Sequence, residues 1–418
     1  MFSGIFSSKE EEKAQNFHPV TDAFKPSEYF GELQPADTEW ACAGGFVTET
    51  QVYYHVLEDG TFLLCQVIYS SIGVWFPTIQ FIVKVFNPTT KETTWKSINA
   101  SNFASPPAGS KLDKRSCKAD QFSITHNLNG DNETYTIVGK PTDDLQISIV
   151  VSRQAKGWKL GNGPKGGYSY FGSNQAKPEG FVVHRFWPRT QATGHVILNG
   201  KALAIDGIGM FAHAIQGMRP NLVAQRWNFA NFQSKELGGV SAIQMEFTTI
   251  DDFGKSGAGS GGVKTNIGSL VVGNKLVAVS GETSWPGETP AAEKADKSQA
   301  EHIQPTFDRD TGYKQPSKIV FQWGASAING EGPFNASLEV DVGGPAAPLG
   351  LLEKVDVLAE IPKVLKTVVN YVSGAKPYIY QWLNPTTLEL SGPASVVPDG
   401  KASVKGVLFN EASYVSNP

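Results

Sequence analysis

Hydrophobic residues along most of the chain fall in short runs that are rich in β-branched and aromatic side chains. From Trp40 onward, turn residues separate these runs, as in QVYYHVLE, TFLLCQVIYSSIG, FPTIQFIVKVFNP, ETYTIVGK and LQISIVVSR. Few windows before residue 348 repeat their apolar positions every three or four residues, as an amphipathic helix would. The pattern therefore predicts a mainly β protein built from antiparallel strands.

Two fourteen-residue stretches predict β-hairpins, GHVILNGKALAIDG at 194–207 and GSLVVGNKLVAVSG at 268–281. Each is bracketed by glycine and has a central Asn-Gly or Gly-Asn pair that suits a two-residue turn. In the first stretch this turn would place Val196 opposite Leu203, with both faces of the hairpin buried. The likeness of the two stretches leaves an internal duplication open.

One segment near 348–373 shows helical periodicity. Apolar residues recur at three- and four-residue steps between Leu352 and Val372, and Pro362 is expected to kink the helix or divide it. Two polar stretches rich in glycine or proline, 254–265 and 286–317, are predicted to be flexible insertions.

The chain length of 418 residues exceeds what one hydrophobic core usually serves, which predicts about two domains. We place the domains at 36–222 and 223–418, after an N-terminal segment of residues 1–35. The formal net charge of −4 is spread along the chain without a basic stripe. Nucleic acid is therefore not an expected partner.

The usual signatures of catalysis and of metal binding are absent from the sequence. Cys42, Cys65 and Cys117 are far apart and form no CxxC pair, so neither a disulfide framework nor a zinc site is indicated. No nucleophile elbow or phosphate-binding loop occurs, and no two histidines stand at metal-ligand spacing. No metal or cofactor is expected. The chain also lacks an 18-residue apolar run and a signal-type apolar core, which favours the cytosol.

The middle of the chain, IDGIGMFAHAIQGMRPNLVAQRWNFANF, holds the residues that best suit a ligand site. Unbranched, polarizable methionines adapt to irregular shapes and suit a cavity for a flexible apolar ligand. Arginine can pair with a carboxylate, stack on a ring or contact a polar head group. The alternative for each residue is a structural role inside a core. The candidate ligand-binding residues are Met210, Phe211, His213, Met218, Arg219, Arg226 and Trp227.

A short apolar ridge lies at the start of the chain. Phe2, Ile5 and Phe6 fall at i, i+3 and i+4, so a helix through MFSGIF would present them on one side. Burying three such side chains contributes roughly 5–9 kcal/mol before the entropy of ordering the segment is subtracted. Glu10 to Glu12 oppose anionic lipid. The two alternatives are a disordered tail and a weak, reversible membrane contact.

Two segments, EWACAGGFVTETQVYYHV and GIGMFAHAIQGMRPNLVAQRWNFANF, resemble the fungal survival factor 1 family, and the similarity extends from about residue 36 to the C-terminus. The resemblance implies two tandem lipocalin-like (calycin-type) antiparallel β-barrels, distantly similar to bacterial carotenoid hydratases. It implies a cytoplasmic, non-enzymatic carrier of ceramide or a related sphingolipid between the endoplasmic reticulum and the Golgi, linked to sphingolipid homeostasis and oxidative-stress survival. It also implies transient membrane contact on both organelles through the N-terminus, with the nucleus as a further location.

The bacterial carotenoid hydratases carry a Gly-x-Gly-Tyr-x-Asp-His stretch. Its aspartate and histidine are proposed to transfer protons. Gly207, Gly209 and His213 match this stretch, but Met210 replaces the tyrosine and Ala212 replaces the aspartate. A general acid for alkene hydration is therefore missing. The leading hypothesis is a carrier with its lipid enclosed in one of the two barrels.

Two other functions stay open at this point. A hydratase or isomerase acting on an isoprenoid or fatty chain would use His213 as proton donor or acceptor, with an acid such as Asp206 within reach in the same cavity. A scaffold for other proteins would instead show exposed apolar patches.

Overall fold

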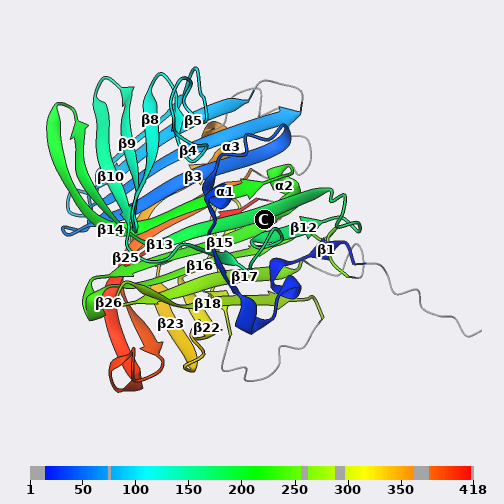
Figure 1. The fold of residues 1–418 in the computed structure, drawn as a ribbon. Helices are drawn as coiled ribbons and strands as arrows, with labels where there is room; N and C mark the ends of the chain where they lie inside the picture. The colour runs from blue at the N-terminus through cyan, green and yellow to red at the C-terminus, as the bar shows by residue number, and fades with distance from the viewer. Residues whose placement is uncertain (1–14, 74–76, 256–261, 288–296, 361–375, 416–418) are drawn as a thin grey trace, which may run out of the picture.

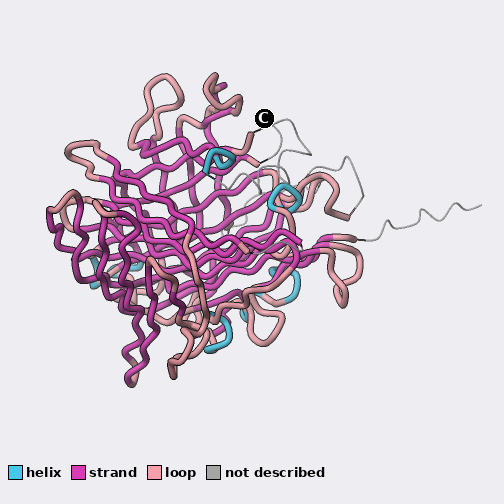
Figure 2. The backbone as a smooth tube through the Cα atoms, turned by 90° about the horizontal axis from the view of Figure 1, so that it is seen from above, coloured by secondary structure: helices cyan, strands magenta, loops and turns pink. Residues whose placement is uncertain are grey.

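The computed structural model describes residues 15–73, 77–255, 262–287, 297–360 and 376–415. Within these ranges the protein is mainly β, as the hydrophobic pattern predicts. Two large curved antiparallel sheets, here called A and B, lie against each other (Figure 1, Figure 2). The helices among the described residues are short: α1 (Pro35–Thr38), α2 (Pro220–Val223), α3 (Val357–Glu360) and four 3₁₀ turns, Val20–Ala23, Pro26–Glu28, Glu236–Gly238 and Pro398–Gly400. No helix in the described ranges is long and apolar enough to cross a membrane.

Sheet A is a curled half-barrel formed by the first half of the chain. Its main strands are β3 (Gly45–Leu57), β4 (Phe62–Gly73), β5 (Thr78–Phe86), β6 (Thr93–Asn99), β7 (Cys117–Lys118), β8 (Phe122–Asn129), β9 (Asn132–Thr142), β10 (Leu145–Arg153), β13 (Gly180–Leu198) and β14 (Lys201–Gln216). They lie in the order β6-β5-β4-β3-β14-β13-β10-β9-β8-β7. Four shorter strands extend the sheet: β1 (Phe17–His18), β2 (Phe30–Glu32), β11 (Trp158–Leu160) and β12 (Tyr168–Phe171).

Sheet B is a nearly closed barrel formed by the second half. Its strands are β15 (Arg226–Ser234), β16 (Val240–Thr248), β17 (Lys264–Val272), β18 (Lys275–Ser284), β19 (Gln299–Ile303), β22 (Lys318–Ser326), β23 (Pro333–Asp341), β24 (Leu351–Asp356), β25 (Tyr378–Ser391) and β26 (Lys401–Tyr414). The order is β18-β17-β16-β15-β26-β25-β23-β22-β19, with β24 paired to β25. An isolated bridge from Ala278 to Ala327 brings the two ends together. The short strands β20 (Thr306–Phe307) and β21 (Lys314–Gln315) pair separately.

The two sheets repeat one strand order. In each, four consecutive strands lead outward from the centre, and the last strand of that half of the chain pairs with the first of the four. The likeness of the two predicted hairpins has a different origin. The hairpin at 194–207 joins β13 to β14, whose counterparts are β25 and β26, whereas the hairpin at 268–281 joins β17 to β18. The repeat therefore lies in the strand order, and those two hairpins are not equivalent.

The pairing predicted for the first hairpin is confirmed, because Val196 lies opposite Leu203. Asn199 and Gly200 take positive φ angles of 50° and 77° at the turn, as a type I′ turn requires. The expected burial of both faces is wrong. Strand β3 pairs with β14 only up to Gly207, so the hairpin tip extends past its neighbour and its outer face is exposed to solvent.

The helix expected near 348–373 is wrong over residues 351–356, which form β24 and pair with β25. Residues 357–360 are helical and form α3, at the end of this described range. Periodicity cannot separate a short apolar helix from a strand, and pairing with the edge of β25 satisfies backbone groups that would otherwise lack partners. Residues 361–375 lie outside the described residues.

Ordered structure also extends into segments that we predicted to be tail or insertion. Phe17, within the expected tail 1–35, is fully buried, and its ring centroid lies 5.0 Å from that of Phe171. The stretch 286–317 contains β19, which pairs with β22. In both places a few apolar side chains within an otherwise polar stretch of sequence pack against a sheet. Residues 1–14, 256–261 and 288–296 lie outside the described residues.

Large side chains fill the interiors of both sheets. In sheet A the rings of Tyr53, Tyr135, Trp187 and Phe211 pack with centroids 4.9–5.6 Å apart. Sheet B encloses Tyr313, Phe321, Trp323, Tyr380 and Trp382, each at most 1% exposed. We expected a lipid enclosed within one barrel, but these aromatic side chains pack inside both sheets, and the cavity described below lies between the sheets.

A third apolar cluster joins the sheets. Tyr54 on β3 and Phe62 on β4 pack against Phe229 on β15 and Phe409 on β26, and the rings of Phe62 and Phe409 stack with centroids 4.5 Å apart. Arg189 of sheet A donates to the side-chain oxygen of Gln233 in sheet B at 3.0 Å. The outer face of sheet A thus covers sheet B, and this contact positions the candidate site.

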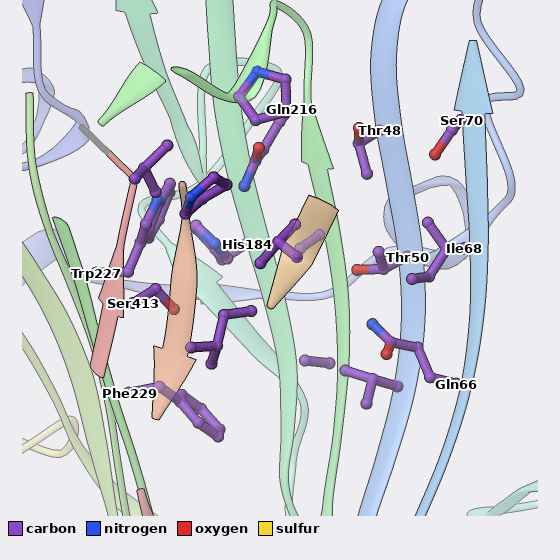
Figure 3. A pocket seen from close by; sticks show the side chains of 18 of the residues that line it. Thr48, Thr50, Gln66, Ile68, Ser70, His184, Gln216, Trp227, Phe229 and Ser413 are labelled. Carbon is purple, nitrogen blue, oxygen red and sulfur yellow. The ribbon is translucent and has the colours of Figure 1, made fainter. Parts of the chain in front are cut away.

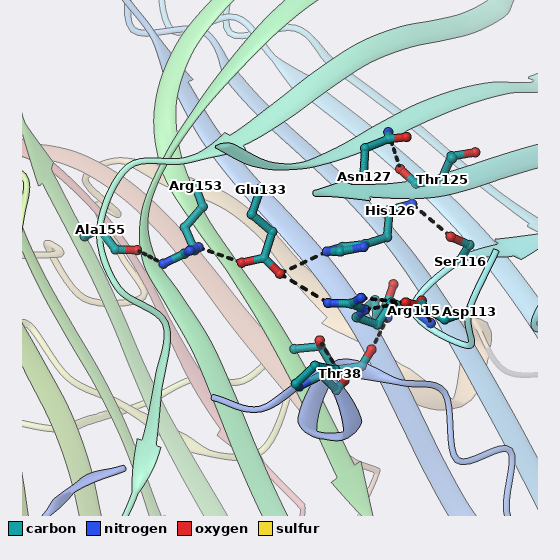
Figure 4. Close-up of polar contacts among 12 residues, drawn as sticks. Thr38, Asp113, Arg115, Ser116, Thr125, His126, Asn127, Glu133, Arg153 and Ala155 are labelled. Carbon is teal, nitrogen blue, oxygen red and sulfur yellow. Dashed lines mark hydrogen bonds and ion pairs between the residues drawn. The ribbon is translucent and has the colours of Figure 1, made fainter. Parts of the chain in front are cut away.

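A network of charged side chains ties strands β8, β9 and β10 together (Figure 4). Glu133 accepts a hydrogen bond from His126 Nε2 at 2.9 Å and forms an ion pair with Arg153 Nε at 2.7 Å. Burial alone would raise the pKa of Glu133, but the hydrogen bond from His126 and the charges of Arg153 and Arg115 hold it below its ordinary value. Each charge is compensated within the network, so we assign it a structural role.

Candidate ligand-binding site

A cavity of about 390 Å³ lies between sheets A and B, beside the aromatic cluster that joins them (Figure 3). One wall comes from β3, β4, β13 and β14 of sheet A, and the other from β15, β25 and β26 of sheet B. Its volume falls within the range of roughly 300–1,000 Å³ that is typical of small-molecule sites.

Strand alternation decides which side chains of sheet A reach the cavity. On β14, Ala212, Ala214 and Gln216 line it, whereas Phe211 and His213 point to the opposite face because successive side chains alternate. On β3, Thr48 and Thr50 also line the cavity. The two alanines leave room where larger side chains would fill the space between the sheets.

The sheet A wall changes from polar to apolar along the strands. Thr48 lies opposite Ser70 and Gln216, and the next row contains Thr50 and His184 on either side of Ala214. The following row contains Val52, Ala212 and Phe186, with Gln66 as its polar member. The cavity therefore has hydrogen-bonding groups at one level and a mainly apolar surface at the next.

His184 is the most deeply buried of the polar side chains at this level. It is 5% exposed, and burial, assisted by the charge of Arg185, lowers its pKa to about 4. Its ring lies parallel to Phe186 and edge-on to Trp227, with centroids 6.0 and 5.7 Å away. A neutral imidazole held in this way offers one donor and one acceptor nitrogen.

Glu411 supplies a carboxyl group on the sheet B wall. Gln381 Nε2 donates to it at 2.6 Å, and burial raises the pKa of Glu411 above its ordinary value. Gln381 in turn accepts from Lys84 Nζ at 2.6 Å, and Lys84 also pairs with Glu353 at 2.7 Å. This buried chain of contacts connects β5 of sheet A to β24, β25 and β26 of sheet B.

The cavity is more accessible near the start of β3. Phe46 and Arg219 are partly exposed there and Pro220 is exposed. The guanidinium carbon of Arg219 lies 4.4 Å from the ring centroid of Phe46, a cation–π contact. We refer to Phe46, Arg219 and Pro220 as the mouth of the cavity.

Three of the seven sequence-predicted ligand-binding residues, Met218, Arg219 and Trp227, line this cavity. The other four lie elsewhere: Met210 in the cluster between the sheets, Phe211 in the interior of sheet A, His213 in a buried hydrogen-bonded pair, and Arg226 on β15 near His302. Phe2, Ile5 and Phe6, expected to contact membrane, lie outside the described residues.

His213 is fully buried and holds two parts of sheet A together. Its Nδ1 lies 2.9 Å from the backbone oxygen of Asp37, and its Nε2 lies 2.8 Å from Oε1 of Glu49. Glu49 also accepts backbone hydrogen bonds from Ala41 and Cys42, each at 2.8 Å. Both ring nitrogens face acceptor oxygens, which fixes the ring.

The acid beside His213 is therefore Glu49, and Asp206, the nearest acid in sequence, contacts Gln191 on the exposed part of the hairpin instead. Neither His213 nor Glu49 lines the cavity, so a chain bound there would not reach the pair. The condition that we set for a hydratase, an acid beside His213 within the same cavity, is not met.

Sequence reasoning missed the polar residues of the cavity, among them Thr50, His184 and Gln216. The available signal was a run of polar side chains within an otherwise apolar strand, as in VTETQVYYHV for β3. That run shows where the strand is polar, but not which face lines a cavity or which strands far away in sequence oppose it.

Solved structures with the same fold are known at low sequence identity. A putative AttH from Nitrosomonas europaea is 12% identical, with 93% of this chain and 98% of that chain covered and a TM-score of 0.50. The protein CghA is 10% identical, with 89% of each chain covered and a TM-score of 0.52. These similarities confirm the predicted fold class alone.

Relatives with curated names are similar along nearly their whole length. A protein of Aspergillus fumigatus named ceramide-binding protein svf1 is 32% identical over 410 residues, which cover 93% of this chain and 91% of the relative. Proteins with the same name from Emericella nidulans and Schizosaccharomyces pombe are each 30% identical, and each comparison covers 95% of this chain and 93% of the relative. The model of the Svf1 family matches residues 3–416. The resemblance noted in the sequence is confirmed, and the chain belongs to the Svf1 family.

Proposed function

We propose that this protein binds a ceramide-class sphingolipid in the cavity between sheets A and B and carries it without chemical change. The observation that supports this most directly is the composition of the cavity wall, where a level of hydrogen-bonding side chains adjoins an apolar level. A ceramide has the same division, with an amide and hydroxyl head joined to two hydrocarbon chains. The relatives are named ceramide-binding proteins, which supports the same ligand class.

The energetics of such binding come mainly from the hydrocarbon. Each methylene that leaves water contributes about 0.8 kcal/mol, so ten methylenes contribute roughly 8 kcal/mol before the loss of translational and conformational freedom is subtracted. The lining rings of Tyr54, Phe186 and Phe229, together with Ile68 and Ile379, offer an apolar surface for this contact.

The proposal includes transfer between the endoplasmic reticulum and the Golgi by a cytoplasmic protein that visits both membranes, with a link to survival of oxidative stress. Phe2, Ile5 and Phe6 would form the membrane-contacting ridge. Three apolar side chains on an otherwise polar segment support reversible contact and not permanent insertion, which is what a carrier requires.

Lipid mass spectrometry and a vesicle transfer assay test the carrier proposal on the full-length protein. We expect purified protein to retain a sphingolipid and to accelerate ceramide movement from donor to acceptor vesicles. Absence of both co-purified sphingolipid and ceramide transfer would refute the proposal.

The membrane part of the proposal has its own test. A variant with Phe2→Ser, Ile5→Ser and Phe6→Ser should bind ceramide in detergent-free solution like the wild type but sediment less with vesicles. A matched control with Ser3→Ala and Ser7→Ala alters the same segment without removing the ridge, and should sediment like the wild type. Equal sedimentation of all three proteins would contradict a membrane role for the ridge.

A further inference from the structure

The polar level of the cavity contains a compact arrangement on three adjacent strands. Ala214 on β14 lies directly between His184 on β13 and Thr50 on β3, and Gln216 follows two residues later on the same face of β14. Directly opposite residues in antiparallel strands have Cβ atoms about 4.5–5.5 Å apart. The methyl group of Ala214 therefore forms the floor of a shallow space with polar side chains on two sides and at one end.

None of these three polar side chains has a hydrogen-bond partner among the described residues. His184 is 5% exposed and lies against the rings of Phe186 and Trp227, and Figure 3 shows His184, Thr50 and Gln216 arranged around the cavity. A buried polar group without a partner is unfavourable by about 1–3 kcal/mol, so such groups are normally paired. His184 is such a buried group, and partly buried Thr50 and Gln216 lie beside it around the same alanine, so the three form an arrangement that a hydrogen-bonding ligand would complete.

The neighbouring carboxyl group of Glu411, unlike these three side chains, has a hydrogen-bond partner. Glu411 already accepts from Gln381, which is itself held by Lys84. Arg219, the charged residue at the mouth, contacts the ring of Phe46. At the polar level itself, the side chains without a hydrogen-bond partner are thus uncharged, and burial keeps His184 uncharged near neutral pH.

We infer that His184, Thr50 and Gln216 form a cradle over Ala214 that binds the head of the lipid and selects an uncharged head group with N–H or O–H donors. Together the imidazole, hydroxyl and carboxamide both donate and accept, so they match an amide flanked by hydroxyl groups. A lipid of equal apolar area without donors leaves acceptors of the cradle unpaired and binds more weakly. This inference rests on the proposed function, because it assigns the head-group end of the same cavity.

The experiment compares two lipids of equal chain length on the full-length protein. One is ceramide, and the other is a diacylglycerol whose hydroxyl is acetylated, which has carbonyl acceptors but no donor. We expect the wild type to bind ceramide about tenfold more tightly, the factor that corresponds to one to two neutral hydrogen bonds. His184→Leu and Thr50→Val should each reduce this preference severalfold, while their affinity for the capped lipid changes by less than about twofold.

Two further variants separate a head-group role from a merely structural one. His184→Gln keeps a donor and an acceptor and should retain part of the preference. His195→Gln changes an exposed histidine on the same strand and should behave as the wild type. If His184→Leu fails to fold, Thr50→Val, which keeps the size and β-branching of the side chain, carries the test.

The outcomes distinguish the inference from the proposed function. Equal binding of both lipids by the wild type, or a preference that survives both His184→Leu and Thr50→Val, would overturn the cradle and leave the carrier intact. Binding of neither lipid by the wild type would overturn both. A preference for ceramide that falls in both variants supports the cradle.

Discussion

Filling the cavity at Ala214 should abolish most lipid binding without unfolding the protein. Ala214→Leu adds three carbons at the floor of the cavity, where Ala214 is only partly buried because it faces that space. If these carbons displace the lipid head from the space above Ala214, the loss of one to two neutral hydrogen bonds at about 1 kcal/mol each weakens binding by about 1–2 kcal/mol, or roughly 5- to 30-fold in Kd. Because the new side chain enters existing space, the free energy of unfolding should change by less than about 1 kcal/mol.

The assay is ceramide transfer between vesicles combined with thermal unfolding of the same preparation. Ala202→Leu is the matched control, because Ala202 lies on the same strand but is exposed near the hairpin tip. It should transfer ceramide like the wild type. Unchanged ceramide binding by a folded Ala214→Leu variant would show that the ligand does not occupy the space above Ala214, and the proposed location of the site would be refuted.

Three other predictions address the buried polar groups. His213→Leu removes the donor to fully buried Glu49 and should lower the free energy of unfolding by about 2–3 kcal/mol in urea titrations. Ceramide transfer per folded molecule should not change. A large loss of transfer would contradict our placement of His213 outside the lipid site. Lys84→Met removes the contact with Glu353 between the sheets and should speed amide hydrogen exchange in β24, so unchanged exchange would count against a role in joining the sheets. For His184, a folded pKa of about 4 lies below the unfolded value of about 6.5. The unfolded state therefore binds more protons between these values, and stability present above pH 6.5 is lost as the pH falls toward 4, by up to about 3 kcal/mol. His184→Gln should lose less stability than the wild type over this pH range. Parallel profiles of unfolding free energy against pH for the two proteins would refute the assignment of this loss to His184.

The local structure of this protein could be predicted largely from its sequence. Short runs of β-branched and aromatic residues specify strands wherever one face can be buried. The Asn-Gly pair fixes the register of the first hairpin down to Val196 opposite Leu203, because positive φ angles at two consecutive residues are accessible to few residue types. Where periodicity was ambiguous, as in 351–356, the edge of β25 decided in favour of a strand.

The site could be predicted only in part, because a cavity between two sheets depends on contacts that are remote in sequence. Of the predicted residues, Met218, Arg219 and Trp227 line the cavity, because they lie near the point where the chain passes from sheet A to sheet B. His213 was a plausible candidate by composition, but strand alternation turns it away from the cavity and toward Glu49.

The sequence by itself determined most strands, the turns and the family, since these depend on neighbouring residues and on a similarity that is recognisable at about 30% identity. Only the tertiary structure decided that aromatic side chains pack inside both sheets and that the cavity described above lies between them. The physical reason is that burial of the second face of a strand depends on what packs against it. The same alternating pattern of alanine, threonine and glutamine can face solvent, a core or a cavity, and the approach of sheet B selects the cavity.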